Sequence, residues 1–232
     1  DSYASNYDPL ANTDDGSCSY TAAFVGLHVE MIYNGPTDGV SLFSNGEKTY
    51  RLYAELNSGI LNQIFADETR PHSIVTTTSF FNEDLFGTHA NLQGEVNAGA
   101  FSFAPILQYD TWASFGDSYS DIPSTVGYVG FDLSAGIILS GSSWTFGGTP
   151  NSDAAIFRVP TDTLCIPDAN GRVLIGQFTT DGDLSGVINI SGLNADGSPW
   201  EATQIAFSST SGVIYGCTDP TASNYDPNAT TD

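Results

Sequence analysis

The stretch AAFVGLHVEMIY, residues 22–33, decides the fold class, because its apolar residues recur at every second position. One face of this pattern holds Val25, Leu27, Val29, Met31 and Tyr33, and the other holds His28 and Glu30. A period of two is typical of a β-strand that is buried on one side. The sequence therefore predicts a strand here, with the apolar face toward the core and His28 beside Glu30 on the surface.

Similar patterns follow along the chain. TYRLYAELN, residues 49–57, repeats the alternation, and its inward set is Tyr50, Leu52, Ala54 and Leu56. RVLIGQFTT, residues 172–180, is apolar on both faces, which fits a central strand covered from both sides. Further β-rich runs are HSIVTTTSFF (72–81), SGVINISG (185–192) and EATQIAFSS (201–209). Each of these runs predicts another strand.

The connections contain the residues of tight turns, as in SNGE (44–47), DANGR (168–172) and NADGSP (194–199). No window shows a sustained helical period, so we expect few helices. The predicted fold is all-β: an antiparallel β-sandwich of jelly-roll or immunoglobulin-like type, with a closed barrel as the alternative. The less regular segment 82–170 is expected to supply loops that cover the ends of the sandwich or line a site.

The charge is strongly acidic, since 5 Lys and Arg residues stand against 27 Asp and Glu residues, a net charge of −22 among 232 residues. Nucleic acids and anionic membranes are poor partners for such a surface, because their binding depends on basic side chains. No apolar run is long enough to insert in a membrane. The acidity fits either solubility in a saline medium or the binding of divalent cations.

The two ends of the chain carry one motif twice. DSYASNYDPLANTDDGSC, residues 1–18, and GCTDPTASNYDPNATTD, residues 216–232, share the core ASNYDP at a separation of 218 residues (224 − 6 for the two Asn). Both are rich in turn-forming residues and read as loops. The expected organisation is a linker half at 1–20, a β-sandwich at 21–215 and the first half of the next linker at 216–232.

These ends resemble the Asp- and Asn-rich linker repeat GCTDPxAxNYDPxAxxDDGSC, which recurs in giant secreted and surface proteins of marine bacteria. Residues 21–215 are also similar to a β-rich domain of such proteins. The resemblance implies a tandem array outside the cell, in which neighbouring repeats of one polypeptide follow head to tail. It further implies that Cys18 and Cys217 each form a disulfide with the neighbouring repeat, an arrangement of oxidising compartments. Cys165 is then left as a buried free thiol, or it pairs with Cys18.

Calcium is the expected cofactor of the linkers, because Ca²⁺ binds six to eight hard oxygen ligands held by a sharply turning loop. The EF-hand register does not fit, since Ala11 and Thr13 stand where acids would be required. The alternative is that these side chains only form turns. Asp181 and Asp183, at a predicted hairpin tip, are a further candidate for a cation, but a plain turn is the favoured interpretation there. The candidate ligands are Asn6, Asp8, Asn12, Asp14, Asp15, Asp219, Asn224, Asp226 and Asp232.

No catalytic motif stands out, so we expect no enzyme. The leading hypothesis is a structural or adhesive repeat module of a filament or surface protein, and the chain should enter and leave the sandwich at opposite ends. The alternative is a carbohydrate-binding module, with glycans as partners and Trp144 and Trp200 as stacking platforms near loops, whereas Trp112 is expected in the core.

Overall fold

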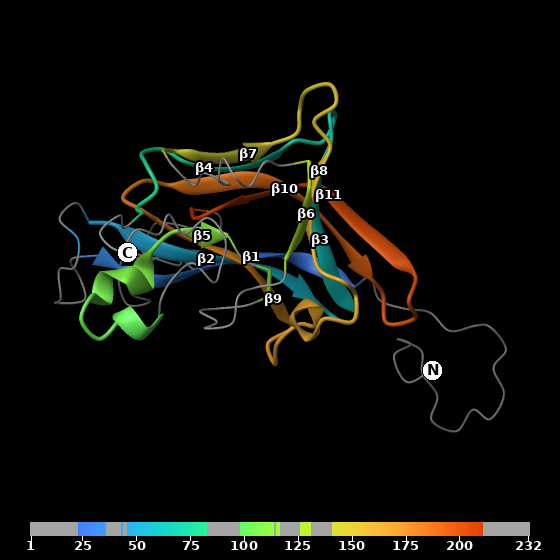
Figure 1. Ribbon diagram of the computed structural model, residues 1–232, viewed down its shortest axis with the longest axis horizontal. Helices are drawn as coiled ribbons and strands as arrows, with labels where there is room; N and C mark the ends of the chain where they lie inside the picture. Colours follow the sequence, from blue (N-terminus) through green and yellow to red (C-terminus); the bar gives the residue numbers. More distant parts are fainter. Residues whose placement is uncertain are drawn as a thin grey trace, which may run out of the picture.

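In the computed structural model, residues 23–35, 43, 46–82, 98–113, 115–116, 126–130 and 141–210 are described. They form two antiparallel sheets that curl into a half-barrel (Figure 1), which confirms the predicted all-β class. The linker halves and both of their cysteines lie outside the described residues.

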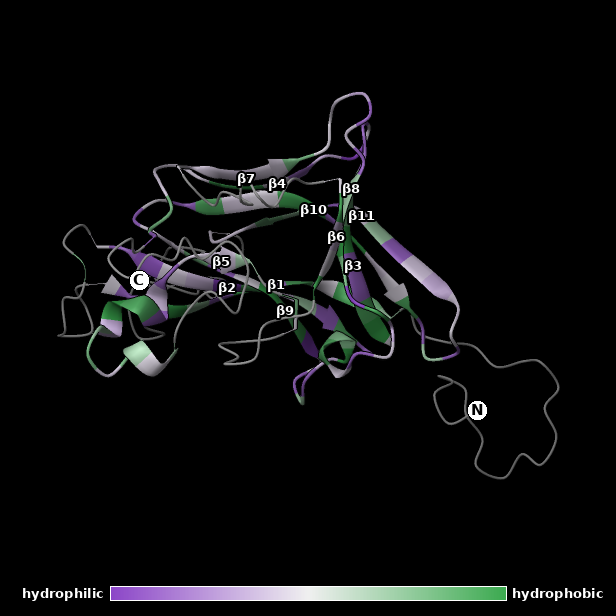
Figure 2. Ribbon diagram, viewed as in Figure 1, coloured by the Kyte–Doolittle hydropathy of each residue, from purple (hydrophilic) through white to green (hydrophobic). Residues whose placement is uncertain are grey.

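The first sheet has four strands in the order β1-β2-β9-β5. These are β1 (Phe24–Asn34), β2 (Lys48–Leu56), β9 (Arg172–Thr180) and β5 (Trp112–Ala113). β9 is a central strand, as predicted, and its residues are buried from Val173 to Thr180. Phe101 helps to cover its outer side by packing on Trp112 and Leu174. In Figure 2 the short helical segments of residues 98–109 lie outside this sheet and are green (hydrophobic) over part of their length.

The second sheet has seven strands and is forked. Its long strand β10 (Leu184–Leu193) pairs with β11 along one side, and with β4 and then β3 along the other. The other strands are β3 (Ile60–Ala66), β4 (His72–Thr76), β6 (Gly127–Val129), β7 (Ser143–Phe146), β8 (Ala154–Phe157) and β11 (Pro199–Ser208). Three short 3₁₀ helices are described: η2 (Ala98–Ala100), η3 (Pro105–Tyr109) and η5 (Thr163–Cys165). None of the described helices is long and apolar enough to cross a membrane.

The core lies between the sheets and contains the alternating residues that the sequence predicts for β2. Tyr50, Leu52, Ala54 and Leu56 are all buried there. Leu27 and Val29 of β1 pack against the same core from the edge of the sheet. The inward alternation is thus confirmed for β2 and, in β1, for Leu27 and Val29. It is wrong for Val25 and Met31, which lie beside the two register shifts of β1 and are 56% and 49% exposed.

The predicted face of β1 is wrong at Tyr33. The register between β1 and β2 shifts between Met31 and Tyr33, so Ile32 is an extra residue at a β-bulge. One added residue moves the following side chains to the opposite face. Tyr33 accordingly packs beside the Tyr109 ring of η3, at 4.5 Å between centroids, instead of entering the core with Leu27 and Val29.

The described chain begins and ends at opposite ends of the half-barrel. The Phe24 ring, at the start of β1, stacks on Trp200 at the start of β11, with 5.9 Å between ring centroids. Farther along, Leu27–Val29 and Ala206–Ser209 lie beside each other, so β1 and β11 run in the same direction (Figure 1). The ten residues of β11 span about 30 Å at 3.3 Å per residue. We refer to the two ends as the Ala23 end and the Thr210 end.

At the Thr210 end the two sheets are joined by threonine hydroxyls, a group that we call the threonine clasp: Thr76, Thr78 and Thr180. The Thr180 hydroxyl lies 2.6 Å from that of Thr76 and 2.9 Å from that of Thr78. It also accepts a hydrogen bond from the backbone N–H of Gly182 at 3.0 Å. A Cβ on Gly182 would lie 2.5–2.8 Å from three threonine hydroxyls, so this position needs glycine for close approach.

Candidate functional site

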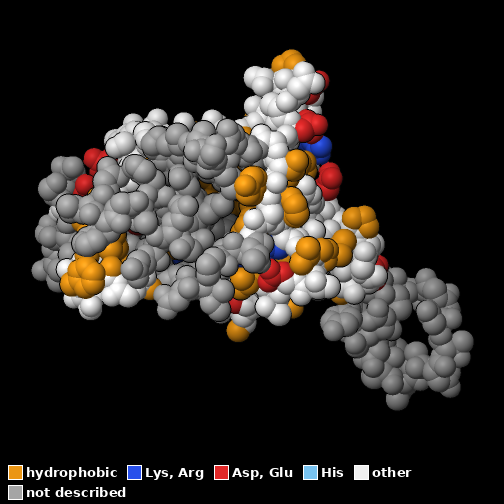
Figure 3. Space-filling view, in the orientation of Figure 1, with side chains coloured by type: hydrophobic (Ala, Val, Ile, Leu, Met, Phe, Trp, Pro, Cys, Tyr) orange, Lys and Arg blue, Asp and Glu red, His pale blue; other side chains and the backbone are white. Residues whose placement is uncertain are grey.

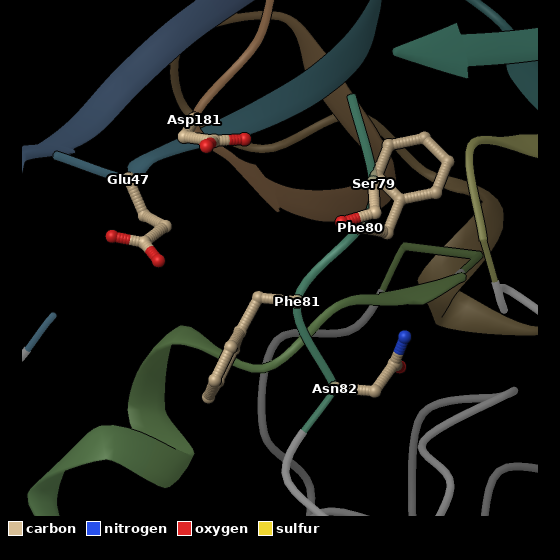
Figure 4. A pocket seen from close by; sticks show the side chains of 6 residues that line it. All are labelled: Glu47, Ser79, Phe80, Phe81, Asn82 and Asp181. Atoms are coloured by element: carbon tan, nitrogen blue, oxygen red, sulfur yellow. The ribbon is translucent and has the colours of Figure 1, made fainter. Parts of the chain in front are cut away.

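A pocket of about 200 Å³ with a mainly polar lining opens beside the threonine clasp. It is lined by Glu47, Ser79, Phe80, Phe81, Asn82 and Asp181. Figure 4 shows Glu47 and Asp181 on one side of the opening and Phe81 across from Glu47. Three separate segments therefore meet at this pocket: the approach to β2, the segment after β4 and the turn between β9 and β10.

Local sequence explains how these segments are placed. The Asp181 turn is the short connection from the first sheet to the second, and the segment after β4 crosses back toward β9. The N–H of Phe81 donates to the carbonyl of Thr179 at 2.8 Å. On the third segment, Gly46 has a φ of 84°, a left-handed conformation that suits glycine, and directs the chain into β2 after Glu47.

The polar side chains at this pocket carry mainly hydrogen-bond acceptors, and Phe80 and Phe81 add two aromatic rings. Two carboxylates, an amide oxygen and a hydroxyl suit ligands rich in N–H or O–H donors. Asp181 was predicted at a hairpin tip. It does lie in a turn, but the hairpin is wrong, because β9 and β10 belong to different sheets. Glu47, Ser79 and Asn82 were not singled out from the sequence. Their only signals were the SNGE turn and the β-rich run 72–81, which place them on loops without showing that the loops meet.

Metal binding can be assessed for the described residues but not for the predicted linker ligands. Within the described residues, no group of three or more His, Cys, Asp or Glu side chains comes together as a cation site. The nine residues predicted as calcium ligands, together with Cys18 and Cys217, lie outside the described residues. Calcium binding and the disulfides of the linker therefore stay predictions.

The expected exposure of Trp144 is wrong. Its side chain is 3% exposed, because it points between the sheets, with its ring 6.4 Å from that of Phe178. Trp112 is buried, as predicted. Trp200 is half-buried against Phe24, and its indole N–H donates to the carbonyl of Ile60 at 3.2 Å. Trp144 and Trp200 therefore do not form an exposed platform for a flat ligand.

Cys165 is a buried free thiol, which confirms the first of its two predicted states. Burial raises its pKa to about 11, and the nearby Asp162 carboxylate adds to this shift. The same corner contains Arg158, whose buried guanidinium donates to Asp162 at 2.9 Å and to the carbonyl of Phe115 at 2.8 Å. A thiol with a raised pKa is a poor nucleophile at neutral pH, so the role of this corner is packing.

The two described β-strand histidines lie in contrasting surroundings. The Nδ1 atom of His28 is 3.6 Å from a carboxylate oxygen of Glu55 on the neighbouring strand, so its closest acid is not the expected Glu30. His72 is fully buried, and its ring stacks on Phe146 at 4.1 Å between centroids. Neither ring nitrogen of His72 has a hydrogen-bond partner. Burial lowers its pKa to about 3, so His72 is neutral in the folded protein.

Two further surfaces stand out. A groove of about 320 Å³ lies between Leu27–Val29 of β1 and Ala206–Ser209 near the end of β11. Exposed apolar side chains also gather over β6 and β8 (Figure 3), among them Val129 and Phe157. The groove lies between two edge strands, one from each sheet.

Comparisons with protein families, with curated proteins and with solved structures find no match to this chain.

Proposed function

We propose that this chain is a non-enzymatic structural and adhesive repeat module of a long extracellular bacterial surface or filament protein. The observation that carries the proposal is the path of the chain, which starts at the Ala23 end and reaches the Thr210 end about one β11 length away. Because the same motif stands before and after this domain, modules joined through it would add length with each repeat.

The interior of the domain supports a load-bearing role. The chain crosses between the sheets at both ends, from β2 to β3 and from β9 to β10. The second crossing is held by the threonine clasp, and near the end of β11 the N–H of Ser209 donates to the carbonyl of Leu184 at the start of β10, at 2.7 Å. Well-packed domains with little loose backbone resist local opening and proteolysis. A carbohydrate-binding role is less well supported, because Trp144 is buried.

A two-module protein tests the proposal directly. Residues 1–232 followed by residues 15–232 recreate one complete linker, GCTDPTASNYDPNATTDDGSC, between two copies of the domain. Small-angle X-ray scattering should show a maximum dimension about 30 Å or more above that of the single chain. A two-module protein scarcely longer than one module, with the domains side by side, would contradict the proposal.

Calcium should stabilise the same two-module protein, because an ion bound only by the folded linker shifts unfolding by mass action. At 100 times its dissociation constant the ion contributes about 2.7 kcal/mol. Thermal unfolding with calcium and with a chelator measures this effect. Asp226→Asn with Asp232→Asn in the first copy, which stand in the recreated linker at the positions of Asp8 and Asp14, should reduce it. The change Asp183→Asn, outside the linker, is the matched control. An unchanged Tm on adding calcium would remove the metal from the proposal.

A further inference from the structure

β1 is an edge strand of the first sheet, and on one side its middle has no paired strand among the described residues. Between its two register shifts, Gly26–Met31 pair regularly with β2. On the other side of Leu27–Val29 lies the groove toward β11. Among the described strands β1 pairs with β2 alone. The outward N–H and C=O groups of this stretch are thus available to another extended strand.

The second edge strand, β11, has a bulge in its middle, whereas the two register shifts of β1 lie near its ends and leave Gly26–Met31 regular. Gln204 has a φ of 53° at a bulge, and its N–H donates at 2.8 Å to the Asn189 side chain of β10. β11 also begins with a proline, and both features are common ways to blunt an edge strand. The regular part of β1 has no proline and no lysine, and its Met31 side chain is 49% exposed.

The sequence of this stretch is complementary to itself. In an antiparallel pair of two identical strands centred on Val29, residues whose numbers add to 58 stand opposite each other. Leu27 then faces the partner's Met31, which would cover that exposed side chain. His28 faces the partner's Glu30, so each twofold pair contains two oppositely charged contacts when the imidazole is protonated.

We propose that β1 pairs with β1 of a second copy of this chain, antiparallel around Val29, so that the two first sheets become one continuous sheet. Such an interface is isologous, since the same residues contribute from both sides. It goes beyond the end-to-end arrangement, because it joins modules side by side. Its use for adhesion between arrays rests on the proposed function, but the pairing itself does not.

Electrostatics sets the conditions for this contact. Two copies that each carry a charge of −22 repel at long range. The Debye length is about 8 Å at 0.15 M salt and about 3 Å at 1 M, so added salt removes much of the repulsion. The strand hydrogen bonds and the Leu27–Met31 contacts are not screened in this way. The dimer should therefore become stronger as NaCl is added.

A cysteine placed on the twofold axis tests the register. Val29→Cys, in a Cys18→Ser, Cys217→Ser background, puts two thiols directly opposite each other at a Cβ separation of about 4.5–5.5 Å. With diamide as oxidant this variant should form a covalent dimer on non-reducing gels. Thr203→Cys on β11 is the matched control and should remain monomeric. The proposal is overturned if Val29→Cys stays monomeric, or if His28→Cys or the control cross-links faster.

A charge exchange tests the contact without any cross-link. His28→Glu places two acids opposite each other and should raise the dimer dissociation constant at least tenfold in sedimentation velocity. Adding Glu30→His restores opposite pairing and should bring the constant back to within about threefold of the original. Equal constants for the single and double variants would contradict the proposal. Failure here leaves the two-module scattering result unaffected, so the two proposals can fail separately.

Discussion

The threonine clasp joins the two sheets of the half-barrel. At the open edge, by contrast, a groove separates Leu27–Val29 of β1 from Ala206–Ser209. At the clasp, the hydroxyls of three threonines and the backbone of the β9–β10 turn hold the sheets together through one buried and two partly buried hydrogen bonds. At the open edge, Phe24 and Trp200 touch, and beyond them a groove separates the strands. Buried polar networks fix one arrangement when all of their members are paired.

The two regions contribute different properties. The clasp region contributes to the stability of the fold, and the open edge exposes side chains that can contact another molecule. Side chains near the clasp, such as Phe80 and Phe178, belong to the main core and are buried. At the open edge, Val25 is 56% exposed and Leu27 and Val29 are only partly covered. Changes near the clasp should therefore reduce the free energy of unfolding, while changes at the edge should mainly alter association.

The largest effect is expected from Phe178→Ala. This ring is fully buried between Phe80 and Trp144, with centroid distances of 5.7 and 6.4 Å. Its removal leaves a cavity and should cost about 3–5 kcal/mol. Phe24→Ala, at the partly buried open edge, should cost less than half as much. Urea unfolding of both variants measures the contrast, and equal losses would remove it.

The next effect is a pH dependence that comes from His72, which packs against Trp144 in the same interior. Its pKa is about 3 in the folded protein and about 6.5 when unfolded, so the unfolded chain binds more protons between these values. Stability contributed by the neutral ring is complete above pH 6.5 and falls as the pH drops through this window, by about 1.4 kcal/mol per unit.

By pH 4 the loss should amount to about 3 kcal/mol relative to a His72→Leu variant, which lacks the titrating group. Chemical unfolding at pH 7, 5.5 and 4 compares the two proteins. The carboxylates titrate in both and cancel in the difference. Parallel stability curves for the two proteins would show that His72 does not titrate as the burial implies.

A smaller effect is expected from Thr180→Val, which keeps the shape of the side chain but removes the central hydroxyl of the clasp. Its buried partner Thr76 loses a hydrogen bond, which should cost about 1–3 kcal/mol, while the exposed Thr78 can bond to water instead. The same change at the exposed Thr203 of β11 should stay within about 0.5 kcal/mol. If both changes had the same effect on thermal unfolding, the clasp would have no special role.

Much of the fold could be predicted, because alternating apolar and polar residues in a strand indicate which side chains are buried. The alternation in β2 predicted that Leu52, Ala54 and Leu56 face the core. The apolar residues on both faces of 172–180 predicted a central strand. Tyr33 was misplaced because a bulge adds one residue without changing the local composition. Trp144 was misplaced because neighbouring glycines and serines suggested a loop, whereas pairing of β7 with β4 turns its ring inward.

The candidate site was harder to predict, because its residues come from three turns whose proximity depends on topology. Glu47 and Asp181 are 134 residues apart (181 − 47) and carry no motif in common. The free side of β1 was equally invisible, since an edge strand and a central strand with one covered face share the same period. Both the pocket and the free side of β1 depend on the order of the strands in the sheets. No single segment of the sequence indicates that order.

Amide hydrogen exchange at two protein concentrations compares the clasp and the open edge most directly. The backbone amides of Phe81 and Gly182 at the clasp should exchange slowly and equally at both concentrations, because their protection is internal to one chain. The outward amides within Leu27–Met31 should exchange quickly in dilute protein and more slowly in concentrated protein with added salt. Edge amides that are slow at every concentration, or clasp amides as fast as those of the edge, would contradict the account.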